Sequence, residues 1–313
     1  MTQQVPPPLS TRPNPSRAPG AVIEPGPSRR ARLQVTAPLC LLGFLAVYLV
    51  AVCTPFGQRA ENALLSGDDA KQAWIYDWSG TAYQSSAMPP LNHTALPTVL
   101  AGLAVIAAVT LVRRCWWQGC AATAIVVVAL GGKELIWMIL PRPDLVDAPV
   151  WLIERSFPSG HAAVPAVLAL GAALVASPRI RPYAIVAGMV WLAVTAAAVQ
   201  ATYHHRPSDV LGSALLACAC YSLATRLLPP ADAPDLTRPP RPLPAVVLTL
   251  PAAGALVAGA RTDSVTQSLV FAAAAFLCAA LFWFTTAQGH RVHSTPHTPR
   301  TGLTTRLASG GNR

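Results

Sequence analysis

Two short motifs carry the residues of this chain that could do chemistry. The first is Ser156-Phe157-Pro158-Ser159-Gly160-His161, and the second, further along the chain, is His205-Arg206-Pro207-Ser208-Asp209. Together they supply two histidines, a carboxylate and helix starts of the kind that bind anions. These groups are what phosphoryl transfer through a nucleophilic histidine requires, without a metal ion.

The first motif predicts the start of a helix. Pro158 presets the φ angle of a helix start, and Ser159 is a good N-cap. The unpaired N–H groups and the dipole at such a start attract an anion such as phosphate, and Gly160 lets a ligand approach closely. A capped helix start that binds nothing would have the same Ser-Gly pair. His161 favours a site, because a histidine in the first turn of an apolar span is costly to hold without a partner.

The second motif predicts another helix start. Pro207 suits the first position of a helix, which places His205 just before the helix and Asp209 in its first turn. The dipole favours a carboxylate there, and Asp209 can accept the Nδ1–H of His205, which leaves Nε2 as a free nucleophile. Taken alone, this motif is equally consistent with a polar turn that contains the tandem pair His204 and His205.

Two basic residues before the first motif are candidate phosphate ligands. Lys133 and Glu134 lie within an apolar run, about 10 Å below its outer end at 1.5 Å per residue. Since consecutive helix residues do not face each other, we expect no simple pair between them, and Lys133 either extends outward or reaches a phosphate. Pro141 should end the helix near Leu140 and leave Arg142 in a loop, where a guanidinium suits phosphate oxygens.

The elements that must position these residues are membrane spans. The chain has 313 residues, of which 53% are hydrophobic and only 12% charged, so it is too apolar for an ordinary soluble domain. We therefore predict an all-α integral membrane protein with about eight transmembrane helices. Apolar runs long enough to cross a bilayer occur near 35–55, 95–112, 120–140, 159–177, 183–203, 210–229, 243–260 and 266–287.

The distribution of charge predicts the orientation. If the N-terminus is cytoplasmic, the inner segments hold 16 basic and three acidic residues, and the outer segments hold six basic and nine acidic ones. This bias favours both termini in the cytoplasm and puts both motifs at the extracytoplasmic face. The basic surplus is thus a topology signal, and no nucleic-acid partner is expected. Arginine outnumbers lysine 21 to 2, which is typical of a GC-rich bacterial genome, so we expect a bacterial inner membrane.

Composition also predicts where the domains begin and end. The six-span core should cover residues 35–229 and a two-span appendage residues 243–287, with a Pro-rich linker at 230–242. Residues 1–34 and 288–313 read as disordered cytoplasmic tails. The seven cysteines lie mostly in apolar runs without metal-ligand spacing, so we expect neither a metal site nor a cofactor.

The motifs resemble the membrane branch of the type 2 phosphatidic acid phosphatase family, which shares its site with the vanadium haloperoxidases. That family has Lys and Arg-Pro separated by six residues, then Pro-Ser-Gly-His, then Ser-Arg followed by a His and an Asp. Residues 158–161 match fully, and so do His205 and Asp209. Two features depart from the pattern: eight residues separate Lys133 from Arg142, and the Ser-Arg pair falls on Ala198-Val199. Arg206 or Arg155 is a possible substitute for the missing arginine.

The resemblance implies a mechanism. His205 would attack phosphorus to give a phosphohistidine, Asp209 would orient its ring, and His161 would protonate the leaving oxygen and then activate water. No metal would be required. The phosphate ligands that the resemblance implies are Arg142, Ser159, Gly160 and Lys133.

The function that follows is a membrane lipid phosphatase acting on a phosphate monoester or diphosphate of a lipid at the extracytoplasmic face. The expected partners are a phosphorylated lipid and the membrane. The alternative is a catalytically weak or inactive family member that binds or moves a phosphorylated lipid, which Val199 and the longer spacing from Lys133 to Arg142 would favour. A third reading is a structural membrane protein whose motifs arose by chance.

Overall fold

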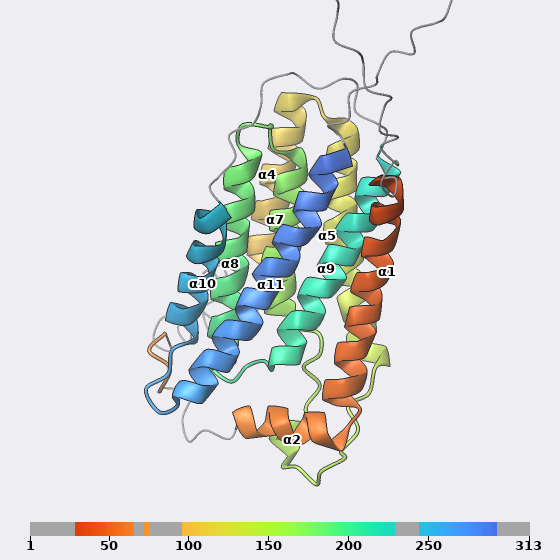
Figure 1. The fold of residues 1–313 in the computed structure, drawn as a ribbon. Helices are drawn as coiled ribbons and strands as arrows, with labels where there is room; N and C mark the ends of the chain where they lie inside the picture. The colour runs from red at the N-terminus through yellow and green to blue at the C-terminus, as the bar shows by residue number, and fades with distance from the viewer. Residues whose placement is uncertain (1–28, 66–71, 76–95, 229–243, 293–313) are drawn as a thin grey trace, which may run out of the picture.

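The computed structural model describes residues 29–65, 72–75, 96–228 and 244–292, which fold into an all-helical bundle (Figure 1). A helix lies at each of the eight positions where the sequence predicts a span. These helices are α1 (Arg29–Val47, continued by a π-helical turn, Tyr48–Val52), α4 (Leu96–Arg113), α5 (Trp116–Ile139), α7 (Gly160–Val175), α8 (Arg181–Ala201), α9 (Pro207–Leu227), α10 (Pro244–Gly259) and α11 (Val265–Val292).

Six helices in the described part of the chain are long and apolar enough to cross a bilayer. The prediction of an all-helical, multi-pass membrane protein is therefore confirmed. The helices α7 and α10 are apolar but have only 16 residues each, about 24 Å of rise against a hydrocarbon core of about 30 Å. The number of eight spans thus stays a prediction.

Helix α7, which begins with the first motif, lies at the centre of the bundle. It packs against α4, α5, α8 and α9, and nearly all of its side chains are buried. Its sequence is rich in alanine and carries apolar residues on every face, as expected for a helix surrounded by others. At Gly171, a Cβ would lie 3.0 Å from Ile106, so the neighbouring helix packs closely. Helix α7 is therefore held by its neighbours on several sides.

The last two helices join the same core. Helix α10 packs on α8, and α11 packs on both α8 and α9, lying across the front of the bundle (Figure 1). The side chains of Phe271 and Phe282 are fully buried in the cluster that includes α7 and α8. Helix α1 begins at Arg29, before the predicted start, and α11 runs to Val292, beyond the predicted end. Most of both predicted tails and the whole predicted linker, 230–242, lie outside the described residues.

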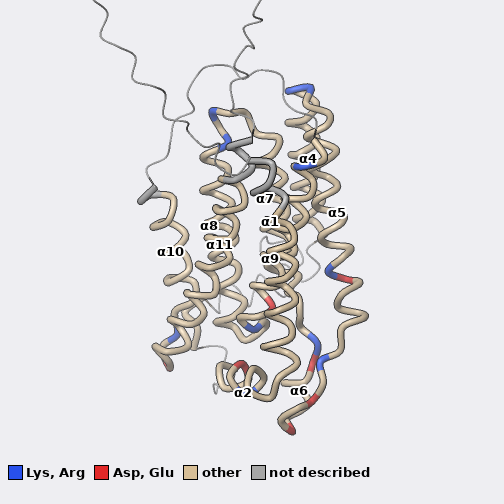
Figure 2. Tube along the Cα trace, turned by 45° about the vertical axis from the view of Figure 1, so that its right-hand side comes forward, with Lys and Arg blue, Asp and Glu red and all other residues tan. Residues whose placement is uncertain are grey.

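One end of the bundle collects the segments that contain the motifs. The loop 140–159, with the one-turn helix α6 (Val150–Ile153), and the turns 202–206 and 260–264 lie at the lower end in Figure 1. The first residues of α1 and the last residues of α11 lie at the opposite, upper end of the bundle in Figure 1. Acidic residues gather in the lower half of the bundle (Figure 2). Both motifs therefore share one end of the molecule.

A short helix that is not one of the predicted spans covers this end of the bundle. Helix α2 (Pro55–Leu64) lies across the lower ends of the long helices (Figure 1). Thr54 caps it by accepting a hydrogen bond from the N–H of Gly57 at 3.0 Å, and Pro55 occupies its first position. The local pair Thr-Pro thus starts a helix in what the sequence alone presents as a polar outer segment.

Candidate active site

The two motif histidines face each other at the lower end of the bundle. Nδ1 of His161 lies 3.2 Å from Nε2 of His205, within hydrogen-bonding distance. Ser159 caps α7, as predicted, by accepting a hydrogen bond from the N–H of Ala162 at 3.3 Å. Pro207 begins α9 and Asp209 lies in its first turn, also as predicted. Two helix starts therefore bring together residues that are far apart in the sequence.

Direct hydrogen bonds tie the two helix starts together. The N–H of Ser159 donates to the carbonyl oxygen of Asp209 at 3.0 Å. The hydroxyl of Ser213 donates to the carbonyl oxygens of Ser159, at 2.6 Å, and Asp209, at 2.9 Å. Because one of these bonds joins backbone to backbone and the other two come from the short hydroxyl of Ser213, the separation of the two histidines does not depend on long side chains.

Asp209 is positioned to orient His205. Its carboxylate is fully buried, and Oδ2 lies 3.4 Å from Nδ1 of His205. The same oxygen accepts a shorter bond, 2.9 Å, from the N–H of Arg206. Oδ1 is buried without a hydrogen-bond partner among the described residues. The backbone therefore holds the carboxylate beside the imidazole.

The turn before α9 separates the roles of the tandem histidines. Tyr203 has a φ of 60°, which is uncommon for a residue with a side chain, and the N–H groups of His204 and His205 both donate to the carbonyl of Val199. Nδ1 of His204 lies 2.8 Å from Oγ1 of Thr202. Burial, reinforced by His205, lowers the pKa of His204 to about 4. The structure thus brings His205, and not His204, to His161.

Lys133 reaches the start of α7. A Cβ at Gly160 would lie 3.4 Å from Nζ of Lys133, so the ammonium group lies directly over the glycine. Nζ also lies 2.5 Å from Oε1 of Glu134, and the expectation that these neighbours form no pair is wrong. Their Cβ atoms point apart, but both side chains are long enough to meet around the helix surface. The ammonium group thus lies within ordinary contact distance of the helix start at Gly160.

Arg142 lies off the helix, as predicted. Helix α5 ends at Ile139 and Leu140 is extended, so Arg142 does not follow the helical spacing from Lys133. Nη1 and Nη2 of Arg142 are buried without hydrogen-bond partners in the described part of the chain. Burial, and then Arg206, lower its pKa, while Glu61 and Asp209 act in the opposite direction. The guanidinium thus keeps free donors near Asp209.

A small pocket of about 10 Å³, roughly the size of one water molecule, lies beside Arg142. Arg155 and Ser156 contribute its other polar groups. The remaining lining residues are Tyr48, Val52, Leu140, Pro141 and Phe157. The pocket therefore combines cationic and apolar surface.

No arginine extends from the end of α8, where the family pattern has one. The side chain at that position, Val199, is 1% exposed and belongs to the core. Arg206 donates from Nη2 to the carbonyl of Leu152 at 2.6 Å and from Nη1 to Oγ of Ser156 at 2.8 Å. It thereby holds the loop before the first motif against α9. Of the two possible substitutes, Arg155 is the one that lines the pocket with Arg142.

Glu61 lies beside the site, although the sequence reading did not select it. It lies on α2, is 6% exposed, and its Oε1 accepts a hydrogen bond from the N–H of Ser208 at 3.0 Å. Burial and the nearby Asp209 raise the pKa of Glu61 to about 7. The Thr54-Pro55 pair was the available signal, since it predicts a helix start in this segment, although it does not indicate which face of the helix is buried.

Comparison with known families agrees with this geometry. The family model of the PAP2 superfamily matches residues 39–232, which is more than half of the chain and spans α1 to the end of α9. No curated protein and no solved structure matches the chain. Members of the matched family are phosphatases. A multi-pass helical bundle that carries the family's motifs at one end therefore identifies this chain as a member of the PAP2 superfamily.

Proposed function

We propose that this protein is a membrane lipid phosphatase that hydrolyses a phosphate monoester or diphosphate of a lipid through a phosphohistidine. The observation that carries the proposal is the 3.2 Å separation of Nδ1 of His161 from Nε2 of His205 in a PAP2-superfamily member. A substrate with a lipid tail fits a site at the end of membrane-crossing helices, where a headgroup would meet it.

The first step is attack of His205 on phosphorus. When Asp209 accepts the Nδ1–H of His205, Nε2 keeps its lone pair and can form the P–N bond. The bond between phosphorus and the leaving oxygen breaks, and the oxygen takes a proton from His161. Without substrate, Nδ1 of His161 lies against the attacking nitrogen, so the phosphoryl group enters between the two rings.

The second step releases phosphate. His161, now neutral, takes a proton from a water molecule, and the resulting hydroxide attacks phosphorus. The P–N bond breaks, which restores His205 and gives inorganic phosphate. The positive charge of Arg142 and Lys133 and the N–H of Gly160 would stabilise the phosphoryl oxygens in both steps. These groups supply the charge stabilisation without a metal ion.

We further propose that the site faces the extracytoplasmic side, with both termini in the cytoplasm. The support is the charge distribution along the chain: 16 basic residues fall in the inner segments, and nine of the 13 acidic residues fall in the outer ones. The position of acidic residues in the lower half of the bundle agrees with this assignment (Figure 2).

Phosphate release by the purified protein tests the proposal. We expect release from phosphatidate or a polyprenyl diphosphate that is inhibited by vanadate and abolished in His205→Ala. The matched control is His204→Ala, because this histidine lies in the same turn but is bonded to Thr202. Equal release by wild type and His205→Ala would refute the proposal.

A second candidate function is binding or transfer of a phosphorylated lipid without hydrolysis. The observation in its favour is Val199, which lies in the core where the family has a phosphate-binding arginine. Lipid binding that persists in both His161→Ala and His205→Ala, with no turnover by wild type, would support this function over hydrolysis.

A further inference from the structure

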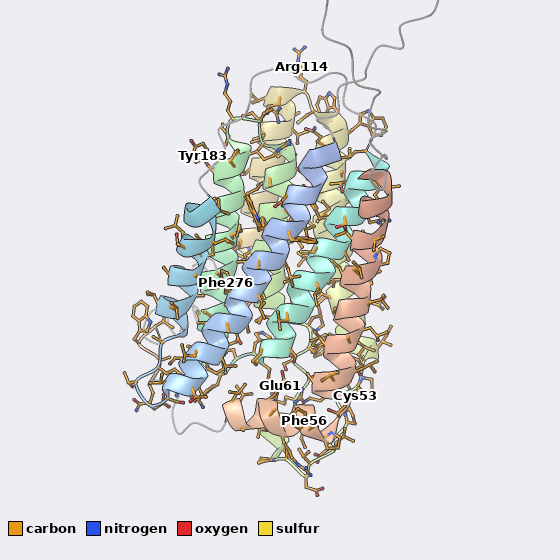
Figure 3. The ribbon with its side chains drawn as sticks, viewed as in Figure 1. Cys53, Phe56, Glu61, Arg114, Tyr183 and Phe276 are labelled. Carbon is orange, nitrogen blue, oxygen red and sulfur yellow. The ribbon has the colours of Figure 1, made fainter. Side chains whose placement is uncertain are left out.

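Helix α2 presents a polar face to the bundle. Its buried residues are Gly57, Gln58 and Glu61, whereas Phe56 is 79% exposed and Arg59 is also exposed. A helix that packs on a bundle through hydrophobic burial would have the opposite pattern. Figure 3 shows Glu61 between α2 and the lower end of α9. The inward side chains of α2 therefore have a role other than filling an apolar core.

Gln58 connects α2 to the loop that carries Arg142. Its Nε2 donates to the carbonyl oxygens of Val52, at 2.7 Å, and Pro143, at 2.6 Å. Its Oε1 accepts a bond from the N–H of Leu145 at 3.2 Å. These bonds flank Arg142 on its C-terminal side, so the position of α2 determines the position of that loop.

Glu61 connects the same helix to the start of α9. Its Oε1 accepts a hydrogen bond from the N–H of Ser208, which lies next to Asp209. Its Oε2 is buried without a partner among the described residues. Among charged groups, Asp209 raises the pKa of Glu61 and Arg206 lowers it. The charge of Glu61 in turn raises the pKa of Arg142. The π-helical turn packed against α2 contributes no charged side chain.

We propose that Glu61 is a positioning residue that holds the start of α9 and, by its charge, sets the affinity of Arg142 for the phosphate group of the substrate. This inference rests on the proposed function, since it concerns the same phosphate. It assigns α2 to the active site although the helix carries none of the family's motif residues.

The charge balance around the site explains the effect on affinity. With Glu61 ionised, the carboxylates of Glu61 and Asp209 balance the guanidinium groups of Arg142 and Arg206. With Glu61 protonated, one positive charge is uncompensated and attracts an anion. Because the pKa of Glu61 is about 7, both states are populated near neutral pH. At the effective dielectric of a partly buried site, we expect about a tenfold weaker binding of a dianion when Glu61 is ionised.

Sulfate binding tests this inference, because sulfate stays a dianion throughout the pH range of the assay. In the full-length protein in detergent, the sulfate Kd of wild type should rise between about pH 6 and about pH 8 by about tenfold more than the Kd of Glu61→Gln does. Gln keeps the acceptor for Ser208 but cannot ionise. The control is Arg59→Gln, which changes a charge on the outer face of α2. Its sulfate Kd should depend on pH as that of wild type does.

Parallel pH profiles for wild type and Glu61→Gln would overturn the inference, as would an equal loss of affinity at both pH values. Thermal unfolding shows whether Glu61→Gln is folded. If it is not, Glu61→Asp takes its place, and because aspartate can still ionise, its sulfate Kd must keep the wild-type pH dependence. The outcome for the proposed function is separate. Wild type that binds sulfate but shows no His205-dependent phosphate release contradicts hydrolysis, whereas the pH dependence of sulfate binding still tests Glu61.

Discussion

Replacement of Gly57 by alanine should displace α2 and impair the site without touching either histidine. A Cβ at Gly57 would lie 2.1 Å from the carbonyl oxygen of Val50 and 2.7 Å from Cα of Ala51. Both are backbone atoms of the π-helical turn, so no side chain can rotate away to relieve the contact. The whole helix must move instead.

The size of the effect follows from these distances. The contact falls about 1.3 Å short of the 3.4 Å at which ordinary van der Waals contact begins, so α2 must retreat by about 1 Å. That movement would stretch the hydrogen bonds of Gln58 and Glu61, which measure 2.6 to 3.0 Å from Pro143 and Ser208, beyond useful length. Overpacking and lost hydrogen bonds together should cost about 3 kcal/mol of stability. A displacement of this size in the loop of Arg142 should lower kcat/KM about 100-fold.

Thermal unfolding and phosphate release by the purified variant measure both effects. The matched control is Gly131→Ala in α5, because a Cβ at that position meets nothing within 4 Å. We expect the control to keep wild-type activity and to gain slightly in stability, since alanine favours a helix by about 1 kcal/mol over glycine. If Gly57→Ala has the melting temperature and activity of Gly131→Ala, then α2 does not position the site.

Three further predictions concern single side chains. Asp209→Asn should leave the protein folded and lower kcat by a factor on the order of 10³, measured by phosphate release, because the amide no longer fixes the His205 tautomer; a kcat within twofold of wild type would contradict this role. Arg142→Gln should raise KM about tenfold or more, with a smaller change in kcat, whereas an unchanged KM would exclude the guanidinium as a phosphate ligand. Glu61→Gln should change the pH dependence of stability. The pKa of Glu61 is raised from 4.5 to about 7, so its contribution is fully present below about pH 4.5 and is lost as pH rises through about 7, which amounts to about 3 kcal/mol. Chemical unfolding at several pH values should show this decline in wild type and a flatter profile in the variant.

Most of what sequence reasoning placed correctly depends on residues near one another in the chain. Ser159 caps α7 and Pro207 begins α9 because capping and the φ angle of proline act within a few residues. The prediction of a helix at each apolar run was correct for the same reason, since the length and hydrophobicity of a run are local properties of the sequence. The ion pair of Lys133 with Glu134 was missed because the rule for consecutive residues describes Cβ directions and not the reach of long side chains.

The buried face of α2 was beyond local reasoning. Thr54 and Pro55 predict a helix, but nothing near Glu61 in sequence indicates that its carboxylate contacts Ser208, far along the chain. The role of position 199 also could not be predicted from nearby residues. The sequence shows a valine where the family has an arginine, and only the packing shows that Val199 belongs to the core while Arg206 holds the neighbouring loop.

The sequence by itself determined the kind of protein, the two helix starts and the side chains from which a phosphatase site can be built. These depend on composition, on caps and on residue types, which are set within a few positions of the chain. The resemblance selected His205 over His204 in advance. Only the tertiary structure decided that the ring of His205 meets His161, that Lys133 lies over Gly160, and that α2 closes the site. Those contacts join residues from different helices, and packing distances of a few ångströms determine which of them form.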